Sequence, residues 1–265
     1  MALLRRLLIG LSIMAGAALV IIVAGVLVVF FSTRSIPVAA PITVASPITV
    51  AAPPQVAIPI EKVELLLTNP IPSRRYVEDA LAALGLPVGT ADGKWDEKTR
   101  RAVCAWRELT YGESSRAMPS DLEARQIVST KVLTPALNQV VGLNVNIACQ
   151  TATWVSAART ILGVFPVSSG MPGYLSTSVG TWQVGWQVNH WYESTLYPEA
   201  MMYRPKFFHR GMAIHGSATD ALVLPYPASH GCVRMLHADL DRLWDAGFGI
   251  GDSVNVYGEW ISDTQ

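Results

Sequence analysis

The chain of 265 residues carries no net charge, because its 20 lysine and arginine residues balance its 20 aspartate and glutamate residues. It also lacks a basic patch and a glycine-rich phosphate loop, so neither nucleic acid nor a nucleotide is indicated as a partner. Histidine and cysteine are scarce, with five and three residues, and no Cys-x-x-Cys or His-x-x-x-His pair occurs. The sequence therefore gives little support to a zinc site.

Charge is missing from a 25-residue run that begins at Leu7 and ends at Phe31. The run is long enough to cross a hydrocarbon core of about 30 Å. Arg5 and Arg6 precede it, which predicts a cytoplasmic N-terminus and an extracytoplasmic C-terminal part. We therefore expect residues 1–31 to form a single-pass anchor in the cell membrane. A cleaved, secreted form is the alternative, because residues 38–40 (VAA) fit a small-residue cleavage site.

Residues 32–60 show no sign of a folded unit. Arg34 is the only charged residue up to Pro59, and six prolines punctuate this stretch. The five residues that begin at Pro41 (PITVA) are repeated from Pro47. Because prolines fix φ and remove backbone donors, we expect an extended, semi-rigid linker that holds the following domains away from the membrane.

Residues 61–133 have the pattern of a small helical module. Apolar residues recur at helical spacing, and serine or glycine stands where a helix would begin or end. The expected helices cover residues 73–84, 97–109 and 120–128, with Ser73 and Ser120 as N-caps. Their expected core positions are Val77, Leu81, Leu84, Ala102, Val103, Trp106 and Leu109.

Residues 134–265 are predicted to be rich in β-structure. Short runs of β-branched and aromatic residues alternate with glycine and proline turns, and only one convincing helix is expected, at residues 237–246. The overall fold class is therefore α+β, with a helical module followed by a mixed β-sandwich. The expected strands cover residues 143–148, 153–156, 161–168, 181–190, 211–215 and 253–257.

The residues suited to catalysis gather in two short motifs, MAIHG at residues 212–216 and SHGCVR at residues 229–234. A thiol with a pKa of about 8.5 needs a base or a cationic neighbour to become a nucleophile, and His215 could serve Cys232 in this way. Gly216 and Gly231 let the backbone approach a substrate closely, and N–H groups beside a nucleophile form an oxyanion hole. The motifs indicate acyl transfer through a cysteine thioester.

Two other interpretations of these motifs stay open on the residues alone. A lone cysteine is usually an inert buried residue, and a lone histidine is usually structural. A zinc site is the other alternative, since histidine and cysteine are zinc ligands. Its candidate ligands would be His209, His215, His230, Cys232 and His237.

The motifs resemble the signature of the L,D-transpeptidase catalytic domain, the YkuD family. The resemblance covers roughly residues 141–258 and extends upstream to VNIACQ at residues 145–150 and SVGTW at residues 178–182. Two positions depart from the family pattern: Ser178 stands where proline is usual, and Arg234 stands where many members carry asparagine. Residues 191–210, which are rich in aromatics and methionine, correspond to the family's lid over the cleft.

The resemblance implies a peptidoglycan L,D-transpeptidase with no metal and no organic cofactor. Cys232 would attack the carbonyl before the terminal D-Ala of a donor stem peptide, and the amine of a neighbouring stem would resolve the thioester. His215 would move the proton, and the same thiol would react with carbapenems. The resemblance further implies that Gly216 orients the imidazole, that the N–H groups of Gly231 and Cys232 hold the oxyanion, and that Ser229, His230 and Arg234 shape the loop or meet the stem carboxylate.

Three alternatives to this function remain. Resolution of the thioester by water would make an L,D-carboxypeptidase, and resolution by a protein amine would attach that protein to the wall. A membrane-tethered wall-binding protein with a vestigial site is the non-enzyme alternative. The module supports wall binding: DGKW at residues 92–95, Thr99 and AVCAW at residues 102–106 resemble a three-helix peptidoglycan-binding module, with Asp96 in place of the usual glycine. A generic helical spacer is the competing interpretation.

An odd number of cysteines in an exported chain leaves one thiol unpaired. Cys104 lies about half a turn from Trp106 on its helix, so it should face away from the core of its own module. Cys149 lies beside a probable turn at the end of the first catalytic strand. We therefore hypothesise a Cys104–Cys149 disulfide between the two domains that leaves Cys232 free, with two inert surface thiols as the alternative.

Overall fold

The computed structural model describes residues 22–23, 26–27, 69–198 and 200–261. It divides into two units, residues 1–52 and residues 53–265. In the first unit, strands β1 (Ile22–Val23) and β2 (Val26–Leu27) pair antiparallel. Apart from these four residues, the anchor and linker predicted at residues 7–31 and 32–60 lie outside the described residues. Among the residues described, no helix has the length and apolar character needed to cross a membrane.

The helical module holds the three predicted helices, α2 (Arg74–Ala83), α3 (Glu97–Tyr111) and α4 (Asp121–Ser129). Ser73 and Ser120 cap α2 and α4 through their side chains, as predicted, and Ser120 forms a capping box with Glu123. Asp96 is the N-cap of α3 and accepts hydrogen bonds from two backbone N–H groups of its first turn. This cap accounts for an aspartate at the position where the module's pattern has glycine.

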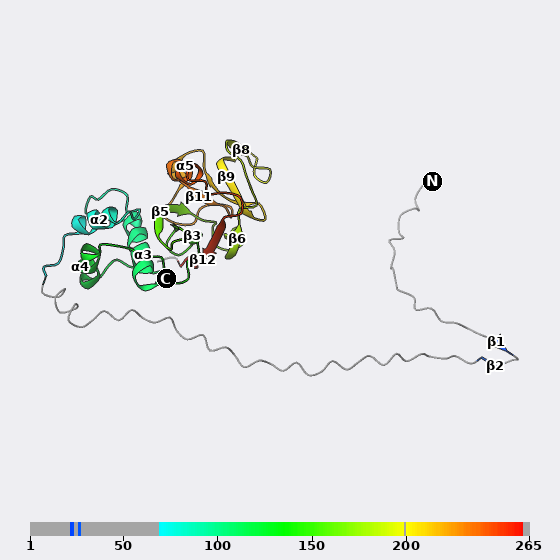
Figure 1. The fold of residues 1–265 in the computed structure, drawn as a ribbon, viewed down its shortest axis with the longest axis horizontal. Helices are drawn as coiled ribbons and strands as arrows, with labels where there is room; N and C mark the ends of the chain where they lie inside the picture. Colours follow the sequence, from blue (N-terminus) through cyan, green and yellow to red (C-terminus); the bar gives the residue numbers. More distant parts are fainter. Residues whose placement is uncertain (1–21, 24–25, 28–68, 199, 262–265) are drawn as a thin grey trace, which may run out of the picture. The chain divides into compact units, whose positions relative to one another are not determined.

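Residues 134–265, the expected catalytic domain, form one mixed sheet in the order β6-β12-β3-β4-β5-β11-β10-β9-β7, with β8 paired to β9. Figure 1 labels β3, β5, β6, β8, β9, β11 and β12 of this sheet. Among the described strands, two pairs are parallel, β12 with β3 and β10 with β11. The helices of this region are α5 (His237–Asp245) and the short 3-10 turn η1 (Asp220–Leu222). The strands are β3 (Gly142–Asn146), β4 (Thr151–Val155), β5 (Ile161–Ser168), β6 (Gly180–Gln183), β7 (Trp186–Gln187), β8 (Trp191–Glu193), β9 (Met201–His209), β10 (Met212–Gly216), β11 (Val233–Met235) and β12 (Ser253–Tyr257).

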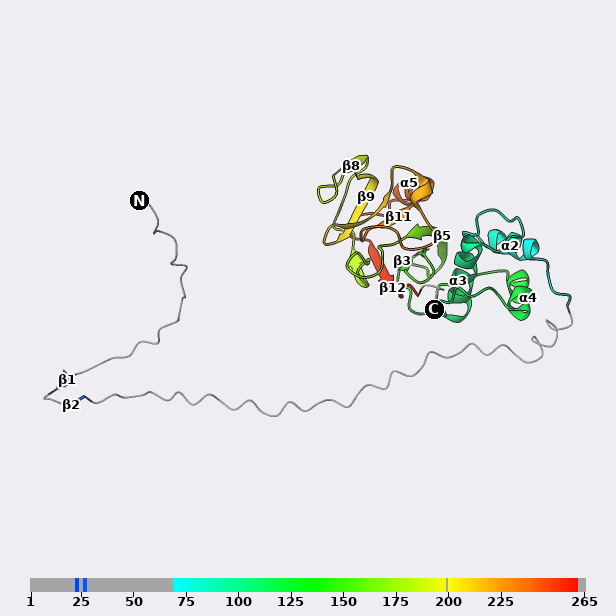
Figure 2. The ribbon, with the colours of Figure 1, turned by 180° about the vertical axis from the view of Figure 1, so that it is seen from behind.

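The β-rich fold with one main helix is confirmed, but the expected sandwich of two sheets is a single curled sheet. Strand β5 makes the connection: it pairs with β4 from Ile161 to Pro166 and then with β11 at Val167 and Ser168. The buried apolar side chains of this sheet form the main core, to which α5 contributes Leu240 and Leu243. Figures 1 and 2 show α5 next to the sheet.

Two predictions for this region were wrong in detail. No strand was expected at residues 201–209, which form the nine-residue strand β9 and pair with β10, β7 and β8. Pairing on both sides and burial of adjacent residues such as Phe207 and Phe208 hide the alternation that marks a strand. The single strand expected at residues 181–190 is two short strands, because Gly185 interrupts it and donates its N–H to Phe207 O.

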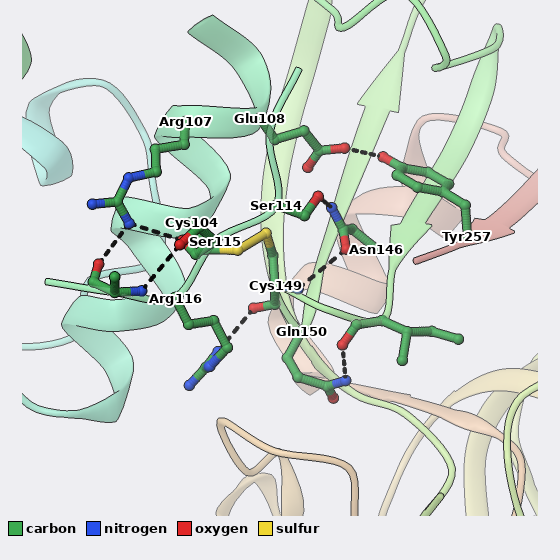
Figure 3. Close-up of a disulfide and its surroundings, with 12 residues drawn as sticks. Cys104, Arg107, Glu108, Ser114, Ser115, Arg116, Asn146, Cys149, Gln150 and Tyr257 are labelled. Carbon is green, nitrogen blue, oxygen red and sulfur yellow. Dashed lines mark hydrogen bonds between the residues drawn. A yellow bond between two sulfur atoms is a disulfide. The ribbon is translucent and has the colours of Figure 1, made fainter. Parts of the chain in front are cut away.

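Helix α3 lies against the catalytic domain and joins the two parts of the second unit (Figure 3). Cys104 on α3 and Cys149 in the β3–β4 turn form a disulfide. Glu108, one turn further along α3, accepts a hydrogen bond from the hydroxyl of Tyr257 on β12. Val164 of β5 lies in the same buried cluster as the core residues of the module. The module and the catalytic domain thus share an apolar core, polar contacts and a covalent link.

Candidate active site

The parallel pair β10 and β11 brings the two catalytic motifs together. Ile214 lies opposite Val233 and His215 opposite Arg234, so Cys232 stands directly before β11 and beside Ala213 of β10. The thiol is held by backbone: Ala213 N–H points at Cys232 Sγ from 3.4 Å, and Gly211 O lies 4.0 Å from the sulfur. The candidate nucleophile therefore lies where its loop enters β11, against the backbone of β10.

The hydrogen bond of His215 defines which ring nitrogen is available as a base. Its Nδ1 lies 2.8 Å from Gly216 O. A carbonyl oxygen only accepts, so Nδ1 carries the proton and Nε2 presents its lone pair. The ring is 7 % exposed, and burial lowers the pKa of His215 to about 4. The imidazole is therefore neutral at neutral pH and able to accept a proton.

Gly216 is required next to this histidine for steric reasons. A Cβ atom at Gly216 would lie 2.4 Å from His237 Cδ2 and 3.0 Å from Tyr203 Cβ. The His237 ring is held in place by a 2.7 Å hydrogen bond between its Nε2 and Ser217 O. A larger residue at position 216 would therefore displace either His237 or the carbonyl that orients His215.

Cys232 is also neutral in the resting site. Burial raises the pKa of its thiol above the ordinary value, while the Ala213 N–H and the nearby Arg234 charge act in the opposite direction. These two pKa shifts favour transfer of the thiol proton during nucleophilic attack rather than before it. They suit a general-base mechanism and not a preformed thiolate–imidazolium pair.

The loop before Cys232 is stabilised by hydrogen bonds of the Ser229 hydroxyl. Ser229 Oγ accepts a hydrogen bond from Gly231 N at 3.1 Å and donates one to Cys232 O at 2.5 Å. Gly231 has φ +117°, which glycine adopts easily and other residues do not. Since Gly231 N–H is engaged by Ser229, and no described residue accepts from Cys232 N–H, the latter is the free donor beside the sulfur.

Thr177 supports this loop and was missed by the sequence analysis. Its hydroxyl donates to Gly231 O at 2.9 Å and accepts from Gly170 N at 2.9 Å, so it links two loops through one buried oxygen. The signal that could have found it is its place directly before the SVGTW motif. A cavity of about 400 Å³ adjoins these loops and is lined by Gly170, Ser176, Thr177 and the C-terminal residues Glu259 and Trp260, among others.

The remaining predicted site residues lie at the rim or elsewhere. His230 is exposed, and its ring lies 4.7 Å from that of Tyr197. Arg234 is half-buried, and its guanidinium makes no hydrogen bond or ion pair with another described residue. Cys104 and Cys149 lie in the domain interface, away from the thiol of Cys232, which is free. The described part of the chain holds no group of three or more His, Cys, Asp or Glu side chains able to bind a metal ion.

Comparisons with known proteins agree on one family. Residues 141–256 match the YkuD family, described as the L,D-transpeptidase catalytic domain. An L,D-transpeptidase from Xylanimonas cellulosilytica is 28% identical, covering 70% of this chain and 93% of its own, with a TM-score of 0.49. One from Stackebrandtia nassauensis is 24% identical, covering 71% and 91%, with a TM-score of 0.45. The search of curated protein sequences returned no match.

Proposed function

Because residues 141–256 of this chain form a YkuD-type L,D-transpeptidase catalytic domain, we propose that the protein cross-links peptidoglycan stem peptides through a thioester on Cys232. The observation that carries the proposal is the parallel pairing of β10 with β11. It brings together the two motifs, one with a neutral imidazole and the other with a free thiol and a backbone N–H that no described residue accepts. These are the base, nucleophile and oxyanion donor that acyl transfer needs.

The first half-reaction forms the acyl-enzyme. Cys232 Sγ attacks the carbonyl carbon before the terminal D-Ala of a donor stem, and His215 Nε2 takes the thiol proton. Cys232 N–H stabilises the oxyanion that develops on the carbonyl oxygen. His215 then gives its proton to the departing nitrogen, so D-Ala leaves as a neutral amine and the C–N bond is replaced by a C–S bond.

The second half-reaction reverses the proton path. The side-chain amine of a diamino acid on a neighbouring stem attacks the thioester carbon, and His215 Nε2 accepts the proton from that amine. When the tetrahedral intermediate collapses, Cys232 leaves as the thiol after receiving the proton back from His215. The product is a new amide bond between two stems, and the enzyme returns to its starting state.

The rim residues offer contacts for the donor stem. Arg234 lies on β11, two residues after Cys232, and its guanidinium makes no hydrogen bond or ion pair with another described residue. It is suited to a carboxylate of the stem because its planar fork matches that group. The His230 ring packs against the Tyr197 ring at an angle of 31°, which supports a role in shaping the edge of the cleft. Ser229 acts through the loop, since its hydroxyl is fully used by Gly231 and Cys232.

The N-terminal half suggests where the enzyme works. The uncharged run from Leu7 to Phe31, preceded by two arginines, supports anchoring in the cell membrane with the catalytic domain outside the cytoplasm. The resemblance of residues 61–133 to a wall-binding module supports a role in holding the enzyme on peptidoglycan. Both are further parts of the proposal and are tested by membrane fractionation and by binding to purified sacculi.

Intact-mass spectrometry tests the proposed chemistry directly. A soluble form of the chain starting at Ile60 is incubated with a carbapenem or a tetrapeptide stem under non-reducing conditions, beside Cys232→Ala. We expect a covalent adduct on the wild type alone. A folded wild-type protein that forms no adduct with either compound would exclude the acyl-enzyme and favour a wall-binding protein.

The acceptor is identified by the products of the stem reaction. Cross-linked dimers in a mixture of donor and acceptor stems support transpeptidation. Release of D-Ala with a shortened stem and no dimer points to an L,D-carboxypeptidase. Transfer of the stem to a protein amine alone indicates attachment of proteins to the wall.

A further inference from the structure

One cysteine of the disulfide between the two domains is followed directly by a buried glutamine. Cys149 and Gln150 are consecutive residues of the β3–β4 turn, and the disulfide ties Cys149 to Cys104 on α3 (Figure 3). Gln150 is fully buried and has φ +57°, a left-handed conformation that costs free energy in a residue other than glycine. Such a conformation persists only where the surroundings hold it.

The side chain of Gln150 uses all of its donors. Its Nε2 donates to Ile147 O at 2.6 Å and to Ser169 Oγ at 2.8 Å, and its Oε1 accepts from Ser169 N at 2.8 Å. The side-chain amide of Gln150 thus forms hydrogen bonds with both the backbone and the hydroxyl of Ser169. Ser169 follows β5 directly, so the glutamine fixes the point at which the chain leaves that strand.

Ser169 is also hydrogen-bonded to the loop that precedes Cys232. Its carbonyl oxygen accepts from Ala228 N at 2.9 Å and from Ser229 N at 3.0 Å. Ser229 in turn holds Gly231 N and Cys232 O through its hydroxyl. Only Gln150, Ser169 and Ser229 therefore separate the disulfide-bonded turn from the backbone of Cys232.

Other residues of the helical module form hydrogen bonds with the β3–β4 turn. Arg116 Nη1 donates to Cys149 O at 3.4 Å, and Asn146 Nδ2 donates to Ser114 Oγ at 2.7 Å. At the other end of the connection, Arg101 Nη2 lies 3.5 Å from Val167 O, two residues before Ser169. Module residues therefore contact both the β3–β4 turn and the end of β5. These contacts are hydrogen bonds, whereas the disulfide is a covalent bond.

We propose that Gln150 is a positioning residue for the acylation of Cys232, and that the Cys104–Cys149 disulfide makes this positioning sensitive to thiol reduction. The inference rests on the proposed acyl transfer and adds a dependence on the module and on the redox state. Breaking the disulfide frees the turn to relax, Gln150 loosens its hold on Ser169, and the loop that aims Cys232 N–H at the oxyanion loses its geometry. Acylation slows, while the thiol itself stays accessible.

The test compares two glutamines of the same interface. Gln150→Met keeps the size of the side chain and removes its hydrogen bonds. Gln139→Met is the matched control, because Gln139 is equally buried and contacts Glu108 and Tyr257 across the same interface without touching the catalytic loop. Two rates are measured on each chain: limiting acylation by a carbapenem, which needs the oxyanion hole, and alkylation of Cys232 by iodoacetamide, which does not.

We expect Gln150→Met to slow the limiting acylation rate by about tenfold to a hundredfold, with alkylation changed by less than about threefold. Gln139→Met should leave both rates within about threefold of wild type even where it lowers the melting temperature. An acylation rate of Gln150→Met equal to that of Gln139→Met overturns the positioning role. An equal fall of acylation and alkylation overturns it too, because that pattern means a general loss of the site.

The redox part uses the full oxidised chain, the same chain reduced with a phosphine, and Cys104→Ser/Cys149→Ser. Reduction should slow wild-type acylation to the rate of the double variant, which should not respond to the phosphine. Unchanged acylation after complete reduction overturns the redox part, and if the double variant fails to fold, reduction of the wild type decides alone. A wild type that is alkylated but never acylated contradicts the proposed function instead, so the two failures are distinguishable.

Discussion

Burial favours the neutral forms of His215 and Cys232, so the acylation rate should depend on pH in a defined way. The pKa of His215 is lowered from 6.5 to about 4, chiefly by burial. Since the neutral ring is the base, acylation should fall only as the pH drops towards 4. The pH dependence of the carbapenem acylation rate measures this, and a midpoint near 6.5 would contradict the buried neutral imidazole.

A second buried ionisable residue lies outside the catalytic motifs. Lys206 on β9 is fully buried, and its Nζ donates to Phe248 O at 2.6 Å and to Gln187 Oε1 at 3.0 Å. The ammonium also lies 3.4 Å from the centre of the Trp244 ring. No carboxylate lies within ion-pair distance of it among the described residues, and burial lowers the pKa of Lys206 to about 7.

This lysine should make the stability of the domain depend on alkaline pH. Between about 7 and 10.5, the unfolded chain binds a proton at Lys206 that the folded chain has released. The free energy of unfolding contributed by this residue therefore rises with pH over that range. We expect Lys206→Met to reduce this rise, as measured by urea denaturation at both ends of the range. An identical rise in variant and wild type would show that the lysine stays charged in the folded state.

At the residue scale, the motifs predicted the free thiol of Cys232 but not most of the hydrogen bonds around it. The bond between His215 and the Gly216 carbonyl was expected only from the resemblance of the motifs to a known family. The engagement of Gly231 N–H by Ser229, and the link from Thr177 to Gly231, could not be predicted. Both depend on a loop conformation that brings together residues far apart in the chain.

At the scale of elements, the cap of α3 gives a direct test of the module. Asp96 Oδ1 accepts from Lys98 N at 2.8 Å and from Thr99 N at 2.9 Å, satisfying two donors that the helix leaves unpaired. We expect Asp96→Ala to lower the free energy of unfolding by about 1 kcal/mol, while Asp96→Ser retains most of it. Urea denaturation followed by circular dichroism measures both, and equal loss in the two variants would argue against capping.

Elements with strong local signals were predictable, and elements that depend on partners were not. The helices of the module follow from apolar spacing and serine caps, and β5 and β12 follow from their β-branched runs. Strand β11 has only three residues and exists because β10 and β5 lie on either side of it. Strand β9 was obscured by burial on both faces and by Pro205 within it.

At the scale of the whole molecule, the predicted boundary between the helical module and the catalytic domain gives no indication of the contacts between them. Residues 61–133 and 134–265 differ in secondary structure, which predicts two domains. Yet Val164 of β5 is buried with the apolar side chains of the module, and Tyr257 of β12 contacts Glu108 of α3. Such contacts between distant residues leave no periodic pattern in either segment, so only the structure shows that the module supports the catalytic sheet.

This integration predicts how the molecule unfolds when its covalent link is removed. The disulfide closes a loop of 45 residues, so Cys104→Ser/Cys149→Ser should lose roughly 4 kcal/mol of unfolding free energy through the greater freedom of the unfolded chain. The shared core and the Glu108–Tyr257 contact persist, so the module and catalytic domain should still unfold in a single transition. Calorimetry and denaturation of the oxidised wild type and the double variant measure both effects. Two separate transitions in the double variant would mean that the disulfide alone unites the domains, because the non-covalent contacts would then be too weak to couple them.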